Sequence, residues 1–216
     1  MKIVAAKKIL KANDQLAEEN RRRLDAAGVY GVNIVGSPGC GKTTLLETLF
    51  ARLDDSVAPA VIEGDIASSI DAERIDALGV PVVQINTDGA CHLDATMIQA
   101  ATDGFDLPKL DVLMIENVGN LVCTAGFDLG EHLRIVLLSV PEGDDKIAKY
   151  PAIFRGSDAL VITKVDLLPH FDFSVDRATA DMKALAPEAK IFQLSAKAGT
   201  GMQEIAAWLA ERMRTR

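Results

Sequence analysis

Seven short apolar runs constrain the fold of this chain more than any other feature. They read VNIVG, APAVIEGD, VPVVQIN, LDVLMIEN, RIVLLSV, DALVITKVD and KIFQLSA. Helical patterns lie between or after them, following the first glycine loop, Asp71 and Leu93, and over residues 178–185 and 201–213. Strands that are apolar on both faces and separated by helices predict a parallel sheet covered on both sides. We therefore expect an α/β fold of about seven mostly parallel strands, with ligands at their carboxyl ends.

The N-terminal region differs in composition from the rest of the chain. Residues 2–24 carry seven basic and three acidic side chains, with apolar residues at helical spacing. The 216 residues, 49% of them hydrophobic, suffice for one full core and are too few for two. We expect a basic, solvated helical extension over residues 1–28, followed by a single domain over residues 29–216.

Charge and cysteine content exclude several classes of protein. With 23 basic and 31 acidic residues, the net charge of −8 disfavours binding to nucleic acid or anionic membranes. No apolar run approaches the roughly 20 residues that span a bilayer, and the N-terminus lacks a signal-peptide core, so we expect a cytoplasmic protein. Three cysteines in a reducing compartment are a poor disulfide framework. Cys40, Cys91 and Cys123 are therefore expected to be free thiols or metal ligands.

The stretch GSPGCGKTT, residues 36–44, joins the strand VNIVG to a helical segment. Gly-x-x-x-x-Gly-Lys-Thr in this setting is typical of the phosphate-binding loop of P-loop NTPases. Backbone N–H groups and Lys42 would hold the β- and γ-phosphates, and the Thr43 hydroxyl would bind Mg²⁺. Cys40 is interpreted as a packing residue within the loop. The predicted phosphate-site residues are Gly36, Gly39, Cys40, Gly41, Lys42, Thr43 and Thr44.

Two carboxylates and a further glycine extend this site. Glu116 ends the run LDVLMIE, and Gly119 follows three residues later. We expect Glu116 to act on Mg²⁺ through water and the Gly119 N–H to contact the γ-phosphate. Asp65 ends VIEGD and is a second candidate for the Mg²⁺ shell. The predicted catalytic residues are Lys42, Thr43, Asp65 and Glu116, with Thr43 and Asp65 as Mg²⁺ ligands.

Two motifs later in the chain indicate the base. In ITKVD, Asp166 can accept from guanine N1–H and N2–H while the stem of Lys164 stacks on the ring. The backbone of SAK, which is Ser195, Ala196 and Lys197, can meet guanine O6. Each motif alone could be an ordinary turn at the end of a strand, but in this order behind a phosphate loop they predict GTP and GDP as ligands.

A separate set of residues suggests a soft metal. GACHLDA places Cys91 beside His92, and Cys123 lies seven residues after Glu116, on a loop expected to follow a neighbouring strand. Two thiolates and an imidazole suit Ni²⁺ or Zn²⁺, with a fourth position left open or filled by another chain. Two unrelated buried thiols are the alternative interpretation. Cys91, His92 and Cys123 are the predicted ligands.

Together these segments resemble the HypB family, the GTPases that support nickel insertion into [NiFe]-hydrogenase. The resemblance covers about residues 30–214 and rests on GSPGCGKTT, EGDIASSIDAERI, GACHLDA, ENVGNLVCTAGFDLGE, EGDDKIAKYP and TKVDLLP. It implies a SIMIBI-class P-loop GTPase with slow hydrolysis and a GTP- and metal-dependent homodimer, with its Cys/His site at the subunit interface. The implied partners are a HypA-type nickel metallochaperone and the hydrogenase large subunit.

The sequence departs from that family at two places. The N-terminus carries neither the Cys-rich nickel motif nor the His-rich tract of some members, so nickel storage is not expected. Thr124 stands where members commonly have proline after the cysteine. Ser37 replaces the lysine of related ATPases with a deviant loop, so their cross-subunit lysine mechanism is not transferred.

Three other functions compete with a nickel-delivery GTPase. A small-molecule kinase would use the same loop but prefer ATP, and TKVD with SAK counts against it. The segments GACHLDA and ENVGNLVC distinguish this chain from a nickel GTPase that serves urease. A metal-binding dimeric scaffold would bind nucleotide only for stability.

Overall fold

A single seven-stranded parallel sheet forms the centre of the computed structural model, which describes residues 5–66 and 68–215. The strand order is β3-β2-β4-β1-β5-β6-β7, and every pairing is parallel. The predicted fold class is confirmed. The strands are β1 (Tyr30–Gly36), β2 (Pro59–Asp65), β3 (Val82–Asn86), β4 (Val112–Glu116), β5 (Leu133–Ser139), β6 (Ala159–Thr163) and β7 (Lys190–Leu194).

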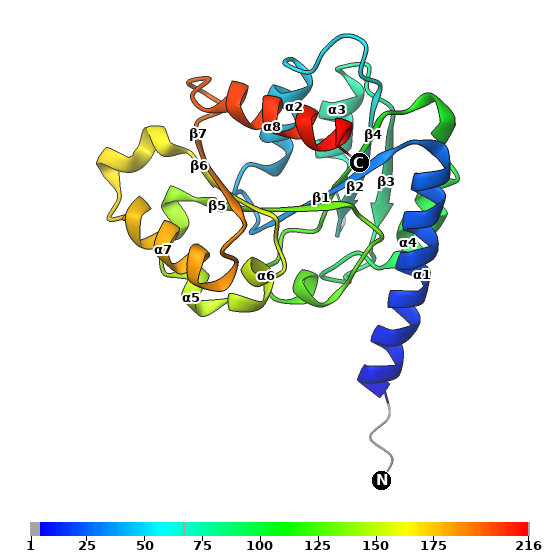
Figure 1. Cartoon of the computed structure of the whole chain (residues 1–216), viewed down its shortest axis with the longest axis horizontal. Helices are drawn as coiled ribbons and strands as arrows, with labels where there is room; N and C mark the ends of the chain where they lie inside the picture. Colours follow the sequence, from blue (N-terminus) through cyan, green and yellow to red (C-terminus); the bar gives the residue numbers. More distant parts are fainter. Residues whose placement is uncertain (1–4, 67, 216) are drawn as a thin grey trace.

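Helices cover both faces of the sheet, as Figure 1 shows. One face packs against α2 (Lys42–Phe50), α3 (Ile70–Asp76) and α8 (Met202–Arg214). The other packs against α1 (Ala5–Ala27), α4 (Ala95–Thr102), α5 (Lys146–Lys149), α6 (Pro151–Arg155) and α7 (Val175–Leu185). The five predicted helices after the phosphate loop are present, whereas α5 and α6 were not predicted because each is too short to show a period.

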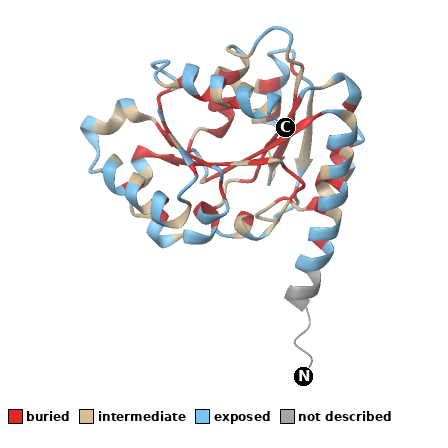
Figure 2. Ribbon diagram, in the orientation of Figure 1, coloured by how far each residue is buried: buried red, intermediate tan, exposed pale blue. Residues whose placement is uncertain are grey.

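The sheet itself is the most buried part of the molecule (Figure 2). Every residue of β1, β4 and β6 is buried. Central strands have neighbours on both edges and helices on both faces, so apolar side chains are needed at every position. This explains why the strands appear in the sequence as continuous apolar runs.

The predicted N-terminal helix is present as α1 over the described residues, and its C-terminal half is packed rather than solvated. Asn20 is buried and donates to the carbonyls of Ala95 and Leu129, at 2.8 and 3.1 Å. Arg21 forms a bidentate ion pair with Asp128, at 2.9 and 2.8 Å. These contacts fix α1 against α4 and the segment before β5.

None of the described helices has the length and apolar character needed to cross a membrane.

Candidate functional site

The loop between β1 and α2 has the backbone of a phosphate cradle. Gly39 and Gly41 have φ of 72° and 101°, a left-handed region that glycine adopts without strain. Gly41 directly precedes α2, whose first residues, Lys42 and Thr43, are 8% and 6% exposed. The N-terminus of a helix and its free N–H groups favour an anion at this place.

Beside this loop lies a cavity of about 220 Å³ where the loop meets the predicted carboxylates and Gly119. Its lining includes Gly39, Lys42, Asp65, Glu116 and Gly119. A Cβ at Gly119 would lie 2.8 Å from the backbone nitrogen of Pro38, so only glycine lets this segment rest directly on the loop. Gly36 ends β1 and does not line this cavity.

The oxygen ligands suited to Mg²⁺ are present in this cavity. Thr43 Oγ1 donates to Glu116 Oε1 at 2.9 Å, and the buried Glu116 Oε2 has no hydrogen-bond partner within the described residues. Burial raises the pKa of Glu116 to about 7, against the opposing effects of Lys42 and the Thr43 hydrogen bond. A buried carboxylate oxygen without a partner and an adjacent hydroxyl fit a hard cation, since such cations prefer oxygen ligands.

Glu63 is a site residue that the sequence analysis missed. It is 2% exposed, faces Glu116 in register across β2 and β4, and lines the same cavity. Carboxylate oxygens of Glu63, Asp65 and Asp71 lie within 4.8 Å of one another. Burial, followed by repulsion from Glu116, Asp65 and Asp71, raises the pKa of Glu63 to about 8. The signal was available, because Glu63 and Asp65 are two residues apart on one strand and share a face.

These raised pKa values predict a specific pH dependence of stability in the nucleotide- and metal-free protein. The folded state keeps protons on Glu63 and Glu116 up to about pH 8 and 7, whereas the unfolded chain releases them near pH 4.5. Stability should therefore fall as the pH rises from 5 to 8, by up to about 1.4 kcal/mol per pH unit for each group. Urea unfolding of Glu63→Gln should show a flatter profile and higher stability than the unmodified protein at pH 8. A Glu63→Gln profile parallel to that of an exposed control, Glu204→Gln, would contradict this assignment.

A second cavity, of about 290 Å³, gathers the residues predicted to bind guanine. It is lined by Cys40, Gly41, Thr44, Lys164, Asp166, Ser195, Ala196 and Lys197, among others. Lys164 has φ of 58° and its Nζ donates to the Gly39 carbonyl at 2.6 Å, so its stem runs from β6 to the phosphate loop. The two cavities share the phosphate loop as one wall, as a site for a base joined to phosphates requires.

Cys40 has the packing role that was expected of it. Its side chain is fully buried, and a Cβ at Gly36 would lie 2.6 Å from its sulfur. The Cys40 carbonyl accepts from Thr163 Oγ1 at 2.7 Å, which ties the loop to β6. Burial raises the pKa of the Cys40 thiol to about 11, so it stays protonated.

The structure brings Cys91, His92 and Cys123 together, with their ligand atoms within 4.8 Å of one another. Two expectations about them are wrong. Their strands are not neighbours, because β2 lies between β3 and β4 and the two loops must span it. Cys91 and Cys123 are also joined as a disulfide, with Cα atoms 6.1 Å apart, rather than being free thiols. A count of cysteines could not show that these loops meet. Because a cysteine binds metal as its thiolate, metal binding by this pair would require the disulfide to be reduced.

Asn120 ties Cys123 to the phosphate loop. Its Oδ1 accepts from the N–H groups of Val122 and Cys123, at 2.7 and 2.9 Å, and its own N–H donates to the Gly36 carbonyl at 3.0 Å. The fully buried Thr124 donates from Oγ1 to the Asn120 carbonyl at 2.7 Å. A proline at position 124 has no hydroxyl and could not make this bond, so threonine supplies a local restraint of its own.

Comparisons with known proteins agree with this geometry. Residues 31–193 match the family described as CobW/HypB/UreG, nucleotide-binding domain. The chain is 48% identical over 206 residues to the hydrogenase maturation factor HypB of Azotobacter chroococcum mcd 1, covering 95% of this chain and 67% of that protein. It is 45% identical to the hydrogenase/urease maturation factor HypB of Helicobacter pylori strain J99, covering 98% and 88% of the two chains.

A solved structure is equally similar. The crystal structure of HypB from Helicobacter pylori in complex with nickel superposes with a TM-score of 0.90 and 44% identity, covering 94% of this chain and 96% of that one. The P-loop fold, the residues that line both cavities and the similarity to these proteins all indicate the same family. The chain has a nucleotide-binding GTPase fold and belongs to the HypB family within the CobW/HypB/UreG nucleotide-binding proteins.

Proposed function

We propose that this protein is a GTP-hydrolysing switch that supports nickel delivery and insertion into a [NiFe]-hydrogenase. GTP binds with its base against Asp166 and Ser195–Lys197, and its phosphates on the loop around Lys42. Thr43, Asp65 and Glu116 would hold Mg²⁺, directly or through water, and the ion would neutralise charge on the phosphates. No arginine finger or water-positioning glutamine is evident in the sequence, so unassisted hydrolysis should run at about 10⁻³ to 10⁻⁴ per second.

The observation that carries this proposal is the short segment shared by the two sites. Glu116 and Gly119 line the phosphate cavity, and Cys123 follows on the same segment. Asn120, between them, bonds to both Gly36 and Cys123. A change in nucleotide state at Gly119 is therefore felt at a metal ligand within a few residues.

Exposed apolar side chains near this segment support a dimer in which the metal site lies at the interface. Ile66, Ile70 and Val122 are 48%, 65% and 64% exposed. Val122 adjoins Cys123, and Ile66 lines the phosphate cavity. A partner subunit seated here would cover these side chains and supply further ligands, since three protein ligands leave a coordination position to fill.

The remaining parts of the proposal follow from family membership. A HypA-type metallochaperone would supply nickel and the hydrogenase large subunit would receive it. We place the protein in the cytoplasm, where reducing conditions keep Cys91 and Cys123 as thiols, and we divide it into the helical extension 1–28 and a GTPase domain over 29–216. Service to a urease is a second candidate function, because one relative is named as a hydrogenase/urease maturation factor.

The proposal is tested by titrating Ni²⁺ and Zn²⁺ into the fully reduced protein, loaded with either GDP or a non-hydrolysable GTP analogue. The two nucleotide forms should differ in metal affinity, and bound metal should change the rate of GTP turnover. Equal affinities together with unchanged turnover would favour the metal-binding scaffold instead.

The Thr124 hydroxyl gives a further prediction that concerns this chain's departure from its family. Thr124→Val removes the bond to Asn120 and should weaken metal binding by about 2- to 10-fold, the effect of one intramolecular hydrogen bond. GTP affinity should stay unchanged, since the phosphate contacts lie elsewhere. Thr124→Ser, which keeps the hydroxyl, should bind metal like the unmodified protein. A Thr124→Ser variant as weak as Thr124→Val would show that the methyl group matters and the hydroxyl does not.

A further inference from the structure

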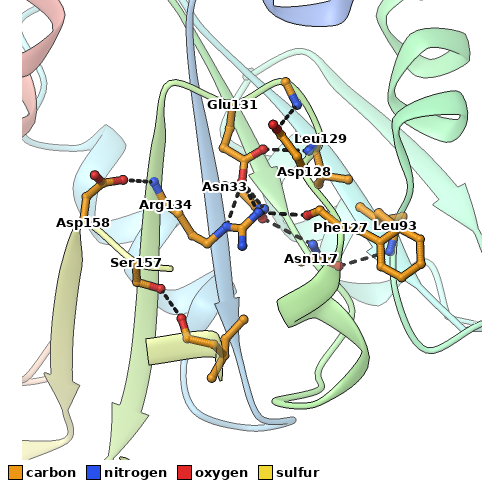
Figure 3. A network of polar contacts seen from close by, with 12 residues as sticks. Asn33, Leu93, Asn117, Phe127, Asp128, Leu129, Glu131, Arg134, Ser157 and Asp158 are labelled. Atoms are coloured by element: carbon orange, nitrogen blue, oxygen red, sulfur yellow. Dashed lines mark hydrogen bonds and ion pairs between the residues drawn. The ribbon is translucent and has the colours of Figure 1, made fainter. Parts of the chain in front are cut away.

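A buried polar network reaches the backbone beside His92 from the nucleotide side. Asn117, the residue after Glu116, is 1% exposed, and its Oδ1 accepts from the N–H of Leu93 at 3.2 Å and of Val118 at 3.0 Å. Its backbone N–H donates to the Ile34 carbonyl of β1 at 3.0 Å. One amide side chain therefore joins the segment that faces the phosphates to the residue that follows His92 (Figure 3).

The same network continues to a second support for His92. Asn117 Nδ2 donates to Asn33 Oδ1 at 3.3 Å, and Asn33 Nδ2 donates to Glu131 Oε1 at 3.0 Å. Arg134 donates to that Glu131 oxygen and, through Nη2, to the Phe127 carbonyl at 2.8 Å (Figure 3). The ring of Phe127 stacks on His92, with centroids 3.9 Å apart and an interplanar angle of 21°.

Phe127 and Asn117, the two residues that position His92 and its neighbour, are held by different parts of the protein. Phe127 is held by Arg134, a residue of β5, and by the ion pair of that arginine with Glu131. Asn117 instead belongs to the segment that includes Gly119 and lines the phosphate cavity. Because a buried N–H that loses its acceptor is costly, a shift of residues 116–119 must carry the Leu93 N–H along or break its bond.

We propose that Asn117 is a positioning residue that transmits nucleotide state to His92, while Phe127 is a fixed platform against which the His92 ring is set. This inference rests on the proposed function, because it assumes that His92 binds metal and that residues 116–119 respond to the nucleotide. It adds a route to His92 separate from the direct link through Asn120 to Cys123. Movement of the Leu93 backbone relative to a stationary Phe127 ring would change the position of the imidazole.

The test compares Ni²⁺ affinity in the GDP form and the GTP-analogue form of the full, reduced chain. Coupling between two ligands is commonly about 5- to 150-fold, so the unmodified protein should show an affinity ratio of at least about 5. Asn117→Ala should reduce this ratio by at least about twofold and leave the part that the Asn120 link to Cys123 carries. Phe127→Leu should weaken Ni²⁺ in both forms by a similar factor and leave the ratio unchanged. A purely structural role for Asn117 would instead lower both affinities together, as Phe127→Leu does.

Amide hydrogen exchange on the unmodified, metal-free protein gives a second measurement that does not depend on the Asn117 variant folding. Protection of the Leu93 N–H should differ between the two nucleotide forms. The Leu129 N–H, which donates to Glu131 Oε2 at 2.8 Å in the fixed part of the network, should be protected equally in both.

Ser157→Ala is the control variant for the affinity measurement. It removes another buried hydrogen bond, the one to the Ile153 carbonyl, and should leave the Ni²⁺ affinity ratio unchanged.

The outcomes separate this inference from the proposed function. An affinity ratio near one in the unmodified protein would overturn the proposed coupling as a whole. An affinity ratio in Asn117→Ala that equals that of the unmodified protein, or Leu93 protection that is the same in both nucleotide forms, would overturn only the role of Asn117.

Discussion

Replacing Lys42 with alanine is expected to abolish measurable GTP hydrolysis. Lys42 begins α2 and lines the phosphate cavity, and its positive charge opposes the rise in the pKa of Glu116 that burial causes. Removing one preorganised group that stabilises transition-state charge costs about 10² to 10³ in rate. Because the starting rate is already slow, a phosphate-release assay should find no turnover above background. Turnover within tenfold of the unmodified protein would mean that Lys42 does not act on the phosphates.

The structure determines the right control for this variant. Lys42 also offsets the charges of the buried Glu63 and Glu116, so Lys42→Ala should lose stability at pH 8, where these carboxyl groups ionise. At pH 6 both carboxyl groups are mostly protonated and the loss should be small. Thermal melts at pH 6 that match the unmodified protein would show an intact fold. A collapsed melt at pH 6 would indicate that the loop is a structural turn.

Asp166→Asn is expected to weaken both GTP and GDP binding by between about tenfold and several hundredfold. Asp166 is exposed in the second cavity, and its carboxylate can accept two hydrogen bonds from the guanine edge. Each bond to a charged group contributes about 1.5–3 kcal/mol, and the asparagine amide keeps one acceptor at most. Equilibrium titration with a fluorescent GDP analogue measures the change.

Asp172→Asn is the matched control, because Asp172 is exposed and follows the same strand but does not line the cavity. It should bind both nucleotides like the unmodified protein. Unchanged GTP affinity in Asp166→Asn would contradict the assignment of this cavity to guanine. Loss of ATP binding in the same variant would indicate a site that does not distinguish guanine from adenine.

The fold could be predicted from the sequence because its strands are buried on both faces. β1, β4 and β6 have only buried residues, so each gives a continuous apolar run that no solvated strand would show. The order of the strands was not predictable in the same way. Cys123 was expected beside the strand that precedes Cys91, yet β2 separates β3 from β4. Strand order depends on how the helices pack, and the local hydrophobic pattern of the sequence contains no information about that packing.

The site could be predicted where a residue belongs to a motif and was missed where it acts through tertiary contacts. Lys42 and Asp166 stand at fixed spacings that reflect their chemistry. Asn117 and Asn120 look like ordinary polar residues after a strand, and only the folded chain shows what their side chains join. Glu63 was hidden within an apolar run, although its spacing from Asp65 placed both on one face.

The coupling of nucleotide to metal through residues 116–123 is tested most directly by sedimentation of the reduced protein. The measurement compares the GDP form with the form bound to a non-hydrolysable GTP analogue, each with and without Ni²⁺, at one protein concentration. The GTP-analogue form should contain more dimer, Ni²⁺ should increase that fraction further, and Cys123→Ala should lose only the response to Ni²⁺, since coupling between ligands is reciprocal. A dimer fraction and a metal stoichiometry that are the same in both nucleotide forms would contradict the proposed switch.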